Sequence, residues 1–251
     1  MTDKVHFLDF IHPITENFFD GKFVLDAGCG MGRFLKLGAE FGSNEIIGID
    51  LSQSVEAAYQ NTRHLPNAHV VQANIFALPF TSMFDYIFSI GVLHHLDDPG
   101  KGFSQLVKLL KKNGRISVWV YSMENNQWVV ALSPIRKHIT SHLPKTVLLG
   151  ISHFIGIFLY LLLQLVYKPA NETNLGRKIK HLLPYNDYFY YSSRLGYLSL
   201  VSVVFDHLVP QLSAYISREE LADWFKRENL DPVFITPRNN MSWRGLGMRT
   251  S

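Results

Sequence analysis

The stretch VLDAGCGMGRF (24–34) constrains the fold of this chain more than any other feature. An apolar run ends at Asp26, and Gly28, Gly30 and Gly32 follow at alternate positions before a helix-like stretch begins. Glycine has no Cβ, so a chain that uses it can turn tightly and approach a ligand closely. The stretch therefore predicts a strand, a ligand-facing turn and a helix in succession.

The same alternation of strands and helices continues as far as Tyr121. Runs rich in Val, Ile and Phe predict strands at Phe23–Ala27, Glu45–Asp50, Ala68–Ala73, Phe84–Ser89 and Arg115–Tyr121. Helices are expected between them, at Arg33–Phe41, Ser54–Leu65 and Lys101–Lys112. Asp98 and Pro99 suit the start of the third helix, and Lys111, Lys112 and Gly114 suit its end. This order indicates a parallel, doubly wound α/β sheet, whose ligands gather at the carboxyl ends of the strands.

The alternation stops after Tyr121 and returns at Ser217. Ser217 and Glu220 form a capping-box pair that opens a helix over Arg218–Asn229. Pro232–Thr236 and Gly245–Arg249 then predict two short strands. The segment between has a different character, since Val147–Tyr167 carries no charge at all.

Polar residues follow three of the predicted strands. Asp50 ends IIGID twenty residues after Gly30, where a carboxylate can accept hydrogen bonds from both ribose hydroxyls. Asn74 follows the third strand, and FDYIFSIGVLHHLDDP contains the fourth. Arg33 stands where the dinucleotide fingerprint requires its third glycine, and Asp26 would repel a pyrophosphate. The turn therefore suits a ligand that carries an ammonium or another cation.

This ordered set of motifs resembles the class I S-adenosylmethionine-dependent methyltransferases, especially the small-molecule group with an LHHL-type fourth motif. The resemblance covers about 23–121 and the tail from about 213 to 249. It implies a Rossmann-like, doubly wound sheet of seven strands, mostly parallel with an antiparallel last strand. We expect an N-terminal cap segment (1–22), a core (23–121 and 211–251) and a mostly helical, hydrophobic and basic lid inserted at 122–210.

The resemblance also implies S-adenosylmethionine as the cofactor and assigns residues to it. Asp26 and the loop of Gly28, Cys29, Gly30 and Gly32 would hold the amino-acid moiety. Asp50 and Leu51 would hold the ribose, Asn74 and Ile75 the adenine, and Ser89 and Gly91 would lie near the methyl group. The family often has Asp at the position of Asn74, whose side-chain oxygen can still accept from the adenine amine. Cys29 is interpreted as a small loop residue and not as a nucleophile.

His94 and His95 are the candidate catalytic residues. Methyl transfer is a displacement in which the enzyme mainly positions the two reactants. A base contributes only where the acceptor must lose a proton, as a phenol or an alcohol must. A structural role for either histidine is the alternative.

Composition excludes several classes of protein. The chain is 47% hydrophobic and 18% charged, which is too apolar for a disordered chain. With one cysteine, Cys29, it has no intrachain disulfide and no cysteine zinc cluster, and we expect no metal. The amino terminus, MTDKVHFLDFIHP, lacks the apolar core of a secretory signal, so we expect a cytoplasmic protein, or one bound peripherally at a membrane.

Positive charge is concentrated in the insertion. The segment 122–210 has eight Lys or Arg and four Asp or Glu, whereas the rest of the chain has sixteen and seventeen. No [DN]-P-P-[FY] tetrad follows the fourth strand, which disfavours amino methylation of nucleic-acid bases or of glutamine. The tail also lacks a basic stripe for binding nucleic acid. Val147–Tyr167 is long enough to cross a bilayer, yet Leu198–Phe205 is too short to return. A lid over the site, a peripheral membrane contact through 143–209, a homodimer face and a spanning hairpin remain open.

The predicted function is methyl transfer from S-adenosylmethionine to an oxygen, nitrogen or carbon of a small, lipophilic acceptor. The alternative is a non-catalytic S-adenosylmethionine-binding protein whose insertion serves assembly or regulation. A nicotinamide oxidoreductase is a third hypothesis, which Arg33 and Asp26 weaken.

Overall fold

The computed structural model describes residues 3–124, 126, 140–208 and 214–250. The chain divides into two compact units, one of 1–124, 214–238 and 242–251, the other of 125–213 and 239–241. The first unit contains a seven-stranded sheet of order β3-β2-β1-β4-β5-β7-β6. Its strands are β1 (Phe23–Ala27), β2 (Glu45–Asp50), β3 (Ala68–Gln72), β4 (Phe84–Ile90), β5 (Leu110–Tyr121), β6 (Leu230–Arg238) and β7 (Ser242–Arg249). Strands β1 to β5 pair in parallel, and β7 runs antiparallel to both β5 and β6, as predicted.

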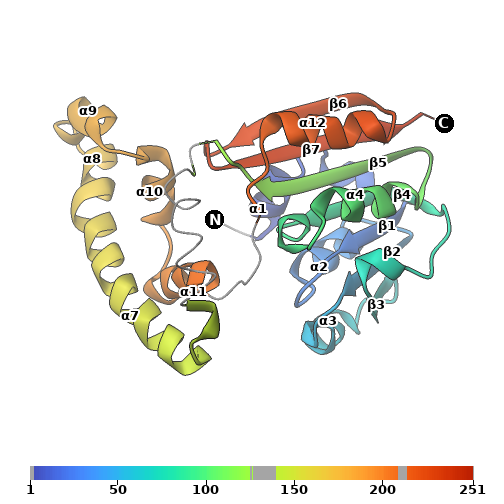
Figure 1. Cartoon of the computed structure of the whole chain (residues 1–251), viewed down its shortest axis with the longest axis horizontal. Coiled ribbons are helices and arrows are strands. Elements are labelled where there is room, and N and C mark those ends of the chain that lie inside the picture. The colour runs from blue at the N-terminus through green and yellow to red at the C-terminus, as the bar shows by residue number, and fades with distance from the viewer. Residues whose placement is uncertain (1–2, 125, 127–139, 209–213, 251) are drawn as a thin grey trace. The chain divides into compact units, whose positions relative to one another are not determined.

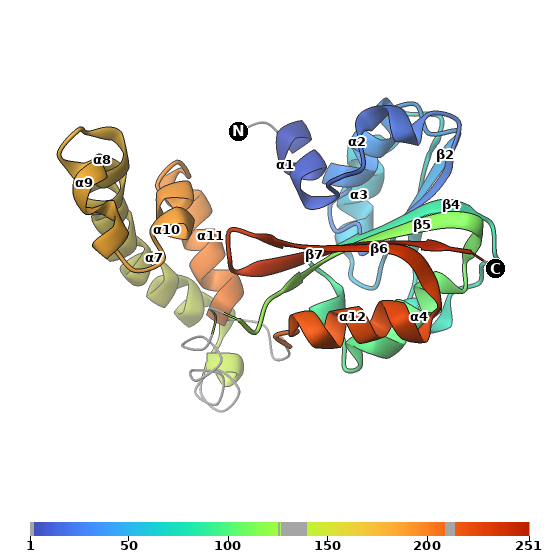
Figure 2. The same cartoon turned by 90° about the horizontal axis from the view of Figure 1, so that it is seen from above.

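Helices cover both faces of this sheet (Figures 1 and 2). One face carries α4 (Pro99–Val107) and α12 (Arg218–Arg227), and the other carries α1 (Asp3–Phe10), α2 (Arg33–Glu40) and α3 (Ser54–Thr62). Short 3₁₀ turns lie at Glu16–Phe19 (η1), Ile75–Ala77 (η2) and Leu93–His95 (η3). A sheet covered on both sides explains why its strands are apolar at consecutive positions and not at alternate ones.

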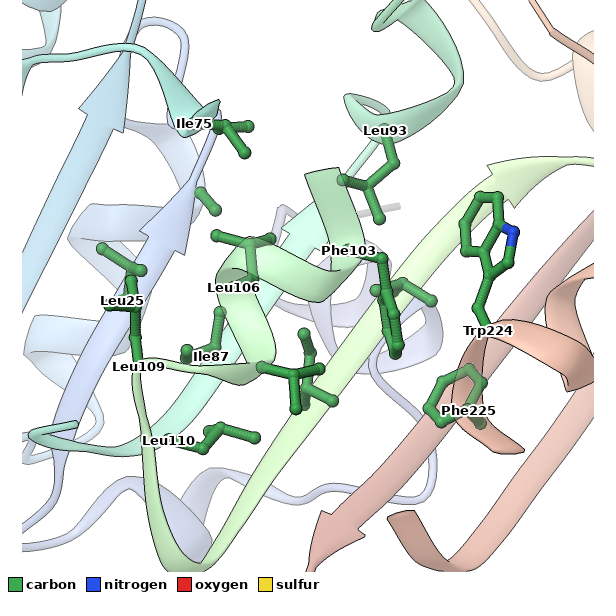
Figure 3. Packing of buried hydrophobic residues seen from close by; sticks show 14 of the residues in the cluster. Leu25, Ile75, Ile87, Leu93, Phe103, Leu106, Leu109, Leu110, Trp224 and Phe225 are labelled. Carbon is green, nitrogen blue, oxygen red and sulfur yellow. The ribbon is translucent and has the colours of Figure 1, made fainter. Parts of the chain in front are cut away.

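Consecutive strand residues enter two separate cores. Leu25 and Ile87 belong to the core beneath α4 and α12, together with Phe103 and Phe225 (Figure 3). Their neighbours Val24 and Phe88 belong to the core on the opposite face. Because strand side chains alternate between faces, a shift of one residue in register would exchange the two sets.

The predicted helix Lys101–Lys112 is wrong at its end. Its start is confirmed, since Asp98 Oδ1 accepts a hydrogen bond from the Lys101 N–H at 2.9 Å and Pro99 opens α4. The helix ends at Val107, however, and Leu110 already pairs with Phe84 as β5 begins. Tertiary contacts decide this boundary, because Leu110 is fully buried and Lys111 Nζ lies 3.0 Å from an oxygen of Asp85.

The C-terminal elements were predicted in the right order, with one cap confirmed. Ser217 Oγ accepts from the Glu220 N–H at 3.0 Å at the start of α12. The two last strands are longer than predicted because they pair with each other as far as Arg238 and Ser242. An ion-pair cluster joins them to the N-terminal helix, where the Asp9 carboxylate lies 2.5 Å from Arg238 Nε and 2.9 Å from Arg244 NH1.

The two ends of the insertion lie side by side at the carboxyl end of β5. The Ile216 N–H donates to the Tyr121 carbonyl at 2.9 Å, and the Met123 N–H donates to the Ile216 carbonyl at 3.0 Å. Glu124 accepts from the Arg218 N–H at 2.8 Å and from Trp243 Nε1 at 2.9 Å. Burial opposes the ionisation of Glu124, but these hydrogen bonds outweigh it and leave its pKa lowered. The insertion therefore leaves the sheet and rejoins it at one point.

The second unit is helical in its described part. Its main elements are α7 (Lys145–Leu162), a π-helical turn η5 (Leu163–Tyr167), α8 (Lys168–Glu172), α9 (Gly176–Ile179), α10 (Asn186–Ser192) and α11 (Tyr197–Leu208), with 3₁₀ turns η4 (Thr140–His142) and η6 (Lys180–Leu182). Helices α7 and α11 run antiparallel, since Gly156 faces Val201 whereas Gln164 Nε2 donates to the Ser193 carbonyl at 2.7 Å. The uncharged run Val147–Tyr167 thus lies in one continuous helix, 145–172.

Candidate functional site

The turn between β1 and α2 uses its three glycines for different reasons. All three have positive φ: +92° at Gly28, +52° at Gly30 and +80° at Gly32. A Cβ at Gly28 would lie 2.1 Å from Val92 Cγ2, and one at Gly32 would lie 3.1 Å from Ala58, so both positions are closed by neighbouring chain. A Cβ at Gly30 would meet nothing within 4 Å. The turn is therefore tightly packed at its two ends and open at its centre.

Asp26 lies beneath this turn as a buried acid. It is 2% exposed, and among the described residues its Oδ2 has no hydrogen-bond partner. Burial raises the pKa of Asp26 well above its ordinary value, and the negative charge of Asp50 raises it further, although a hydrogen bond from the Leu35 backbone N–H acts in the opposite direction. A buried carboxyl oxygen without a donor is costly, so it marks a place where a donor or a cation can bind.

Asp50 joins the end of β2 to the same turn. Its Oδ2 accepts from the Gly30 N–H at 2.9 Å, and its Oδ1 accepts from the Ser52 N–H at 2.9 Å and the Ser52 hydroxyl at 2.7 Å. The neighbouring Leu51 is 68% exposed. Each carboxylate oxygen has two acceptor sites, so Oδ1 is fully engaged by Ser52 and Oδ2 can accept one further hydrogen bond while Asp50 holds the loop.

The residues predicted for the next strand end lie around a 3₁₀ turn. Asn74 Oδ1 accepts from the Phe76 N–H at 2.9 Å and caps η2, while the side chain itself is exposed. Ile75 is 7% exposed and belongs to the core beneath α4. The capping bond holds Asn74 in place and engages one of the two acceptor sites of its oxygen.

Strand β4 brings two further predicted residues beside the glycine turn. Ser89 is fully buried and its hydroxyl donates to the Ala27 carbonyl at 2.9 Å, which ties β4 to β1. Gly91 has φ +79°, and a Cβ there would lie 3.5 Å from the Trp119 ring. The Ser89 hydroxyl is therefore already hydrogen-bonded within the sheet. Gly91 allows the chain to turn beside the Trp119 indole.

His94 is a buried histidine that follows β4. It is fully buried, and neither ring nitrogen has a hydrogen-bond partner among the described residues. Burial, and then the neighbouring His95, lower the pKa of His94 well below its ordinary value, so the ring is neutral at pH 7. His95 is partly exposed and its ring centroid lies 4.3 Å from that of His94. A neutral imidazole without a partner can accept a proton or a hydrogen bond.

An aromatic cluster surrounds the two histidines, and we did not predict it from the sequence. The Tyr121 ring lies 4.1 Å from the ring of His94, 5.4 Å from that of Trp119 and 5.9 Å from that of Tyr215. Trp119 and Tyr121 share one face of β5 because they are two residues apart, whereas Tyr215 arrives from beyond the insertion. The pattern WVY at the end of a strand was the available signal for the first two.

Cys29 is a buried cysteine whose environment disfavours the reactive thiolate. It is 7% exposed, and its side chain packs against Gly48 of β2. A Cβ on Gly48 would lie 3.0 Å from the Cys29 Sγ. Burial, with the charges of Asp26 and Asp50, raises the pKa of the Cys29 thiol far above its ordinary value. Within the described residues no three His, Cys, Asp or Glu side chains are placed to hold a metal ion.

A family model described as a methyltransferase domain matches residues 25–118. This region contains β1 to β4, most of β5, the glycine turn and both histidines. The matched part of the chain is therefore the part that carries nearly all of the candidate site.

Curated relatives of the chain include tRNA U34 carboxymethyltransferases. That of Pseudoalteromonas atlantica is 28% identical over 117 residues, which is 45% of this chain and 36% of the relative. That of Aeromonas hydrophila is 35% identical over 100 residues, which is 38% of this chain and 31% of the relative. The chain thus spans about a third of the length of these relatives, and more than half of its own residues lie outside the match.

Solved structures share the fold over nearly the whole chain. An S-adenosylmethionine-dependent methyltransferase from Thermotoga maritima has a TM-score of 0.52 at 13% identity, covering 98% of this chain and 88% of that one. Magnesium protoporphyrin IX methyltransferase from Synechocystis, with S-adenosylhomocysteine bound, has a TM-score of 0.51 at 14% identity, covering 92% and 75%. At these identities the likeness establishes the architecture alone.

Proposed function

Residues 25–118 belong to the class I S-adenosylmethionine-dependent methyltransferases, and from this premise we propose that the chain methylates a small, lipophilic acceptor. The cofactor assignment is supported by the buried Asp26 carboxyl, whose Oδ2 lacks a partner among the described residues and lies beneath a loop that is open at Gly30. The small, lipophilic acceptor is supported by the aromatic cluster of Tyr121, Trp119 and Tyr215 beside His94. When bound, the cofactor supplies an electrophilic methyl group on a sulfonium.

The residues of the glycine turn fit the cofactor's two polar ends. Asp26, with Gly28, Cys29, Gly30 and Gly32, would hold the ammonium-bearing amino-acid moiety, and the positive charge of that group would favour the ionised form of Asp26. Asp50 would accept from a ribose hydroxyl with the acceptor site of Oδ2 that the Gly30 N–H leaves free, because Ser52 already engages both sites of Oδ1.

The remaining cofactor contacts come from the neighbouring strand ends. Leu51 would contact the ribose, and Asn74 and Ile75 would contact the adenine. Ser89 and Gly91 border the methyl group, where Ser89 acts through its backbone because its hydroxyl is bonded to Ala27.

His94 and His95 are assigned to the acceptor side. A neutral His94 accepts the proton of a hydroxyl acceptor, and Tyr121, Trp119 and Tyr215 provide an apolar, aromatic surface beside it. Aromatic rings bind flat or lipophilic molecules through apolar area and stacking. The insertion serves as a lid that excludes water during transfer. A lipophilic acceptor partitions into membranes, and a peripheral membrane contact of the insertion would bring the site close to such an acceptor.

The relatives named as tRNA-modifying enzymes provide the rival acceptor. The charge of the chain outside 122–210 argues against RNA as the acceptor, because sixteen Lys or Arg are balanced there by seventeen Asp or Glu. RNA-binding surfaces neutralise phosphates with an excess of cations. A small molecule therefore fits this core better.

The test is transfer of a radiolabelled methyl group into fractionated extract of the source cell. We expect the label in organic-soluble small molecules, to be identified by mass spectrometry. Label in nuclease-sensitive material would assign the RNA acceptor instead. Tight cofactor binding with no labelled product in any fraction would favour a non-catalytic binding protein.

A further inference from the structure

The long helix of the insertion has two opposite faces. Leu148, Ser152, Gly156 and Leu163 are buried, and they recur at intervals of four and seven residues on the side of α11. A Cβ on Gly156 would come within 2.8 Å of Val201 Cγ2, so small residues bring α7 and α11 close together. This face is the one that holds the helical hairpin.

The opposite face is apolar and exposed. Its centre is formed by Val147, Phe154, Phe158, Leu161 and Leu165, which are 46%, 65%, 61%, 48% and 72% exposed, and Ile155, Ile157 and Leu162 extend it to either side. At about 100° per residue these five fall within one narrow stripe, about half a turn from the buried set. We call these five residues the apolar stripe. A helix on the surface of a water-soluble protein normally carries polar side chains there, and no charge interrupts this one between Lys145 and Lys168.

A second exposed apolar group lies beyond the C-terminal end of the same helix, in α9, in η6 and at the residue that precedes α9 (Figure 1). Leu175, Ile179 and Leu182 are 75%, 49% and 71% exposed. Arg177, Lys178 and Lys180 are exposed between them. We call these six residues the basic tip. Apolar residues interleaved with exposed cations are typical of segments that lie at the surface of an anionic membrane.

The hairpin has the wrong dimensions to cross a bilayer. Within the described residues, the single helix with the length and composition of a span is 145–172. Its partner α11 has 12 residues, about 18 Å at 1.5 Å per residue, against a hydrocarbon core of about 30 Å. Both ends of the insertion also meet at β5, through Met123 and Ile216. A single crossing would place them on opposite sides of the membrane.

We propose that the apolar stripe and the basic tip together form a surface that docks in the plane of an anionic bilayer. The stripe enters the boundary between headgroups and acyl chains, and Arg177, Lys178 and Lys180 bind the lipid phosphates. Charge favours a bilayer over a second copy of this chain. Between 140 and 208 there are six Lys or Arg and three Asp or Glu, so the same surface on a partner offers few acids to pair with those cations.

Docking of this kind would let the enzyme take a lipophilic acceptor directly from the bilayer. That consequence rests on the proposed function, but the docking itself does not. It is measured without turnover, so a failure of the surface and a failure of the methyltransferase assignment have separate readouts.

The experiment is co-sedimentation of the full chain with vesicles of phosphatidylcholine, with and without phosphatidylglycerol. We expect binding to the anionic vesicles that weakens as salt is added. Arg177→Gln/Lys178→Gln/Lys180→Gln should lower the partition coefficient about 100-fold, because each of the three cations contributes about fivefold near such a surface. Phe154→Gln/Phe158→Gln/Leu165→Gln should abolish binding. All six positions are exposed, so folding and cofactor binding are retained.

Matched variants in the first unit provide the controls. Lys108→Gln/Lys112→Gln/Lys226→Gln removes the same charge, and Val5→Gln/Tyr59→Gln/Phe234→Gln removes exposed apolar groups from the sheet-containing unit. Both should bind vesicles like the parent. The proposal is overturned if the parent does not bind anionic vesicles, or if the tip and stripe variants bind as it does. A stripe variant that only converts a dimer to a monomer would assign the surface to a second copy.

Depth is measured with Phe158→Trp in vesicles of brominated lipids. An in-plane helix predicts stronger quenching of that tryptophan by bromines near the headgroups than by bromines near the chain ends. The reverse order would mean a buried, spanning hairpin and would contradict the in-plane surface.

Discussion

The Asp50 carboxylate accepts the Gly30 N–H at 2.9 Å, which joins the end of β2 to the centre of the glycine turn after β1. The two residues are twenty positions apart in the chain, and this bond fixes the loop at its one open position. Asp50→Ala should therefore weaken S-adenosylmethionine binding by about 1–3 kcal/mol, the usual range for lost hydrogen bonds to a charged group. Calorimetry measures the change, with Asp97→Ala, an exposed acid, as the control. Tight NADH binding in place of S-adenosylmethionine would contradict the assignment.

Gly28 and Gly30 should respond differently to the same substitution. Gly28→Ala places a Cβ 2.1 Å from Val92 Cγ2 and should destabilise the fold, in the range of about 1–3 kcal/mol for overpacking. Gly30→Ala meets nothing within 4 Å and should cost about 1 kcal/mol of backbone strain, while blocking the ligand. Urea unfolding and calorimetry separate the two effects. Adding Val92→Ala should restore part of the lost stability only in the Gly28 variant.

The stability of the ligand-free protein should fall as the pH rises because of Asp26. Its pKa is raised in the folded chain, so the folded state favours the protonated carboxyl. The cost of ionising Asp26 begins as the pH rises above its ordinary value of 3.8 and grows until the raised pKa is passed. Asp26→Asn should then have a higher Tm than the parent at pH 7 and no advantage well below pH 4, but should lose cofactor binding. A Tm difference that is independent of pH would contradict this prediction.

His94 should matter for turnover more than for cofactor affinity. If the acceptor is a hydroxyl, His94→Gln or His95→Gln should lower kcat by about 10²–10⁴-fold, the usual contribution of a positioned base. The pKa of His94 is lowered, so the base form persists below pH 6.5 and the acid limb of the rate profile should lie below that value. His64→Gln, at an exposed position, is the control. Full activity of both variants on the native acceptor would make these histidines structural.

Removing the insertion should separate cofactor binding from transfer. The flanks meet through Met123 and Ile216, so a short Gly/Ser linker can replace residues 126–212 without moving β5 or α12. We expect the shortened chain to bind S-adenosylmethionine, to be more soluble and to have lost transfer to its native acceptor. Calorimetry and the radiolabel assay measure the two properties. Transfer at the original rate would contradict the role of the insertion as a lid.

The first strand, the turn after it and two helix caps were predictable because local features determine them. A buried parallel strand must be apolar at successive positions, and the turn after β1 must use glycine where φ is positive, so VLDAGCGMGRF specifies both. The caps at Asp98 and Ser217 are local in the same way, since each side chain bonds to a backbone three residues on. The methyltransferase domain followed from these elements in their order.

Local patterns of residues thus predict the sheet, the order of the helices between its strands and the position of Asp26, Asp50 and His94 at neighbouring strand ends. Tertiary packing sets where α4 ends, because the burial of Leu110 and the Lys111–Asp85 pair override a local helix signal. It also decided that Tyr215 meets Tyr121 across the whole insertion, and that the uncharged helix buries one face and exposes the other. Contacts between residues far apart in the chain depend on how the elements pack, and no local pattern of residues encodes that packing.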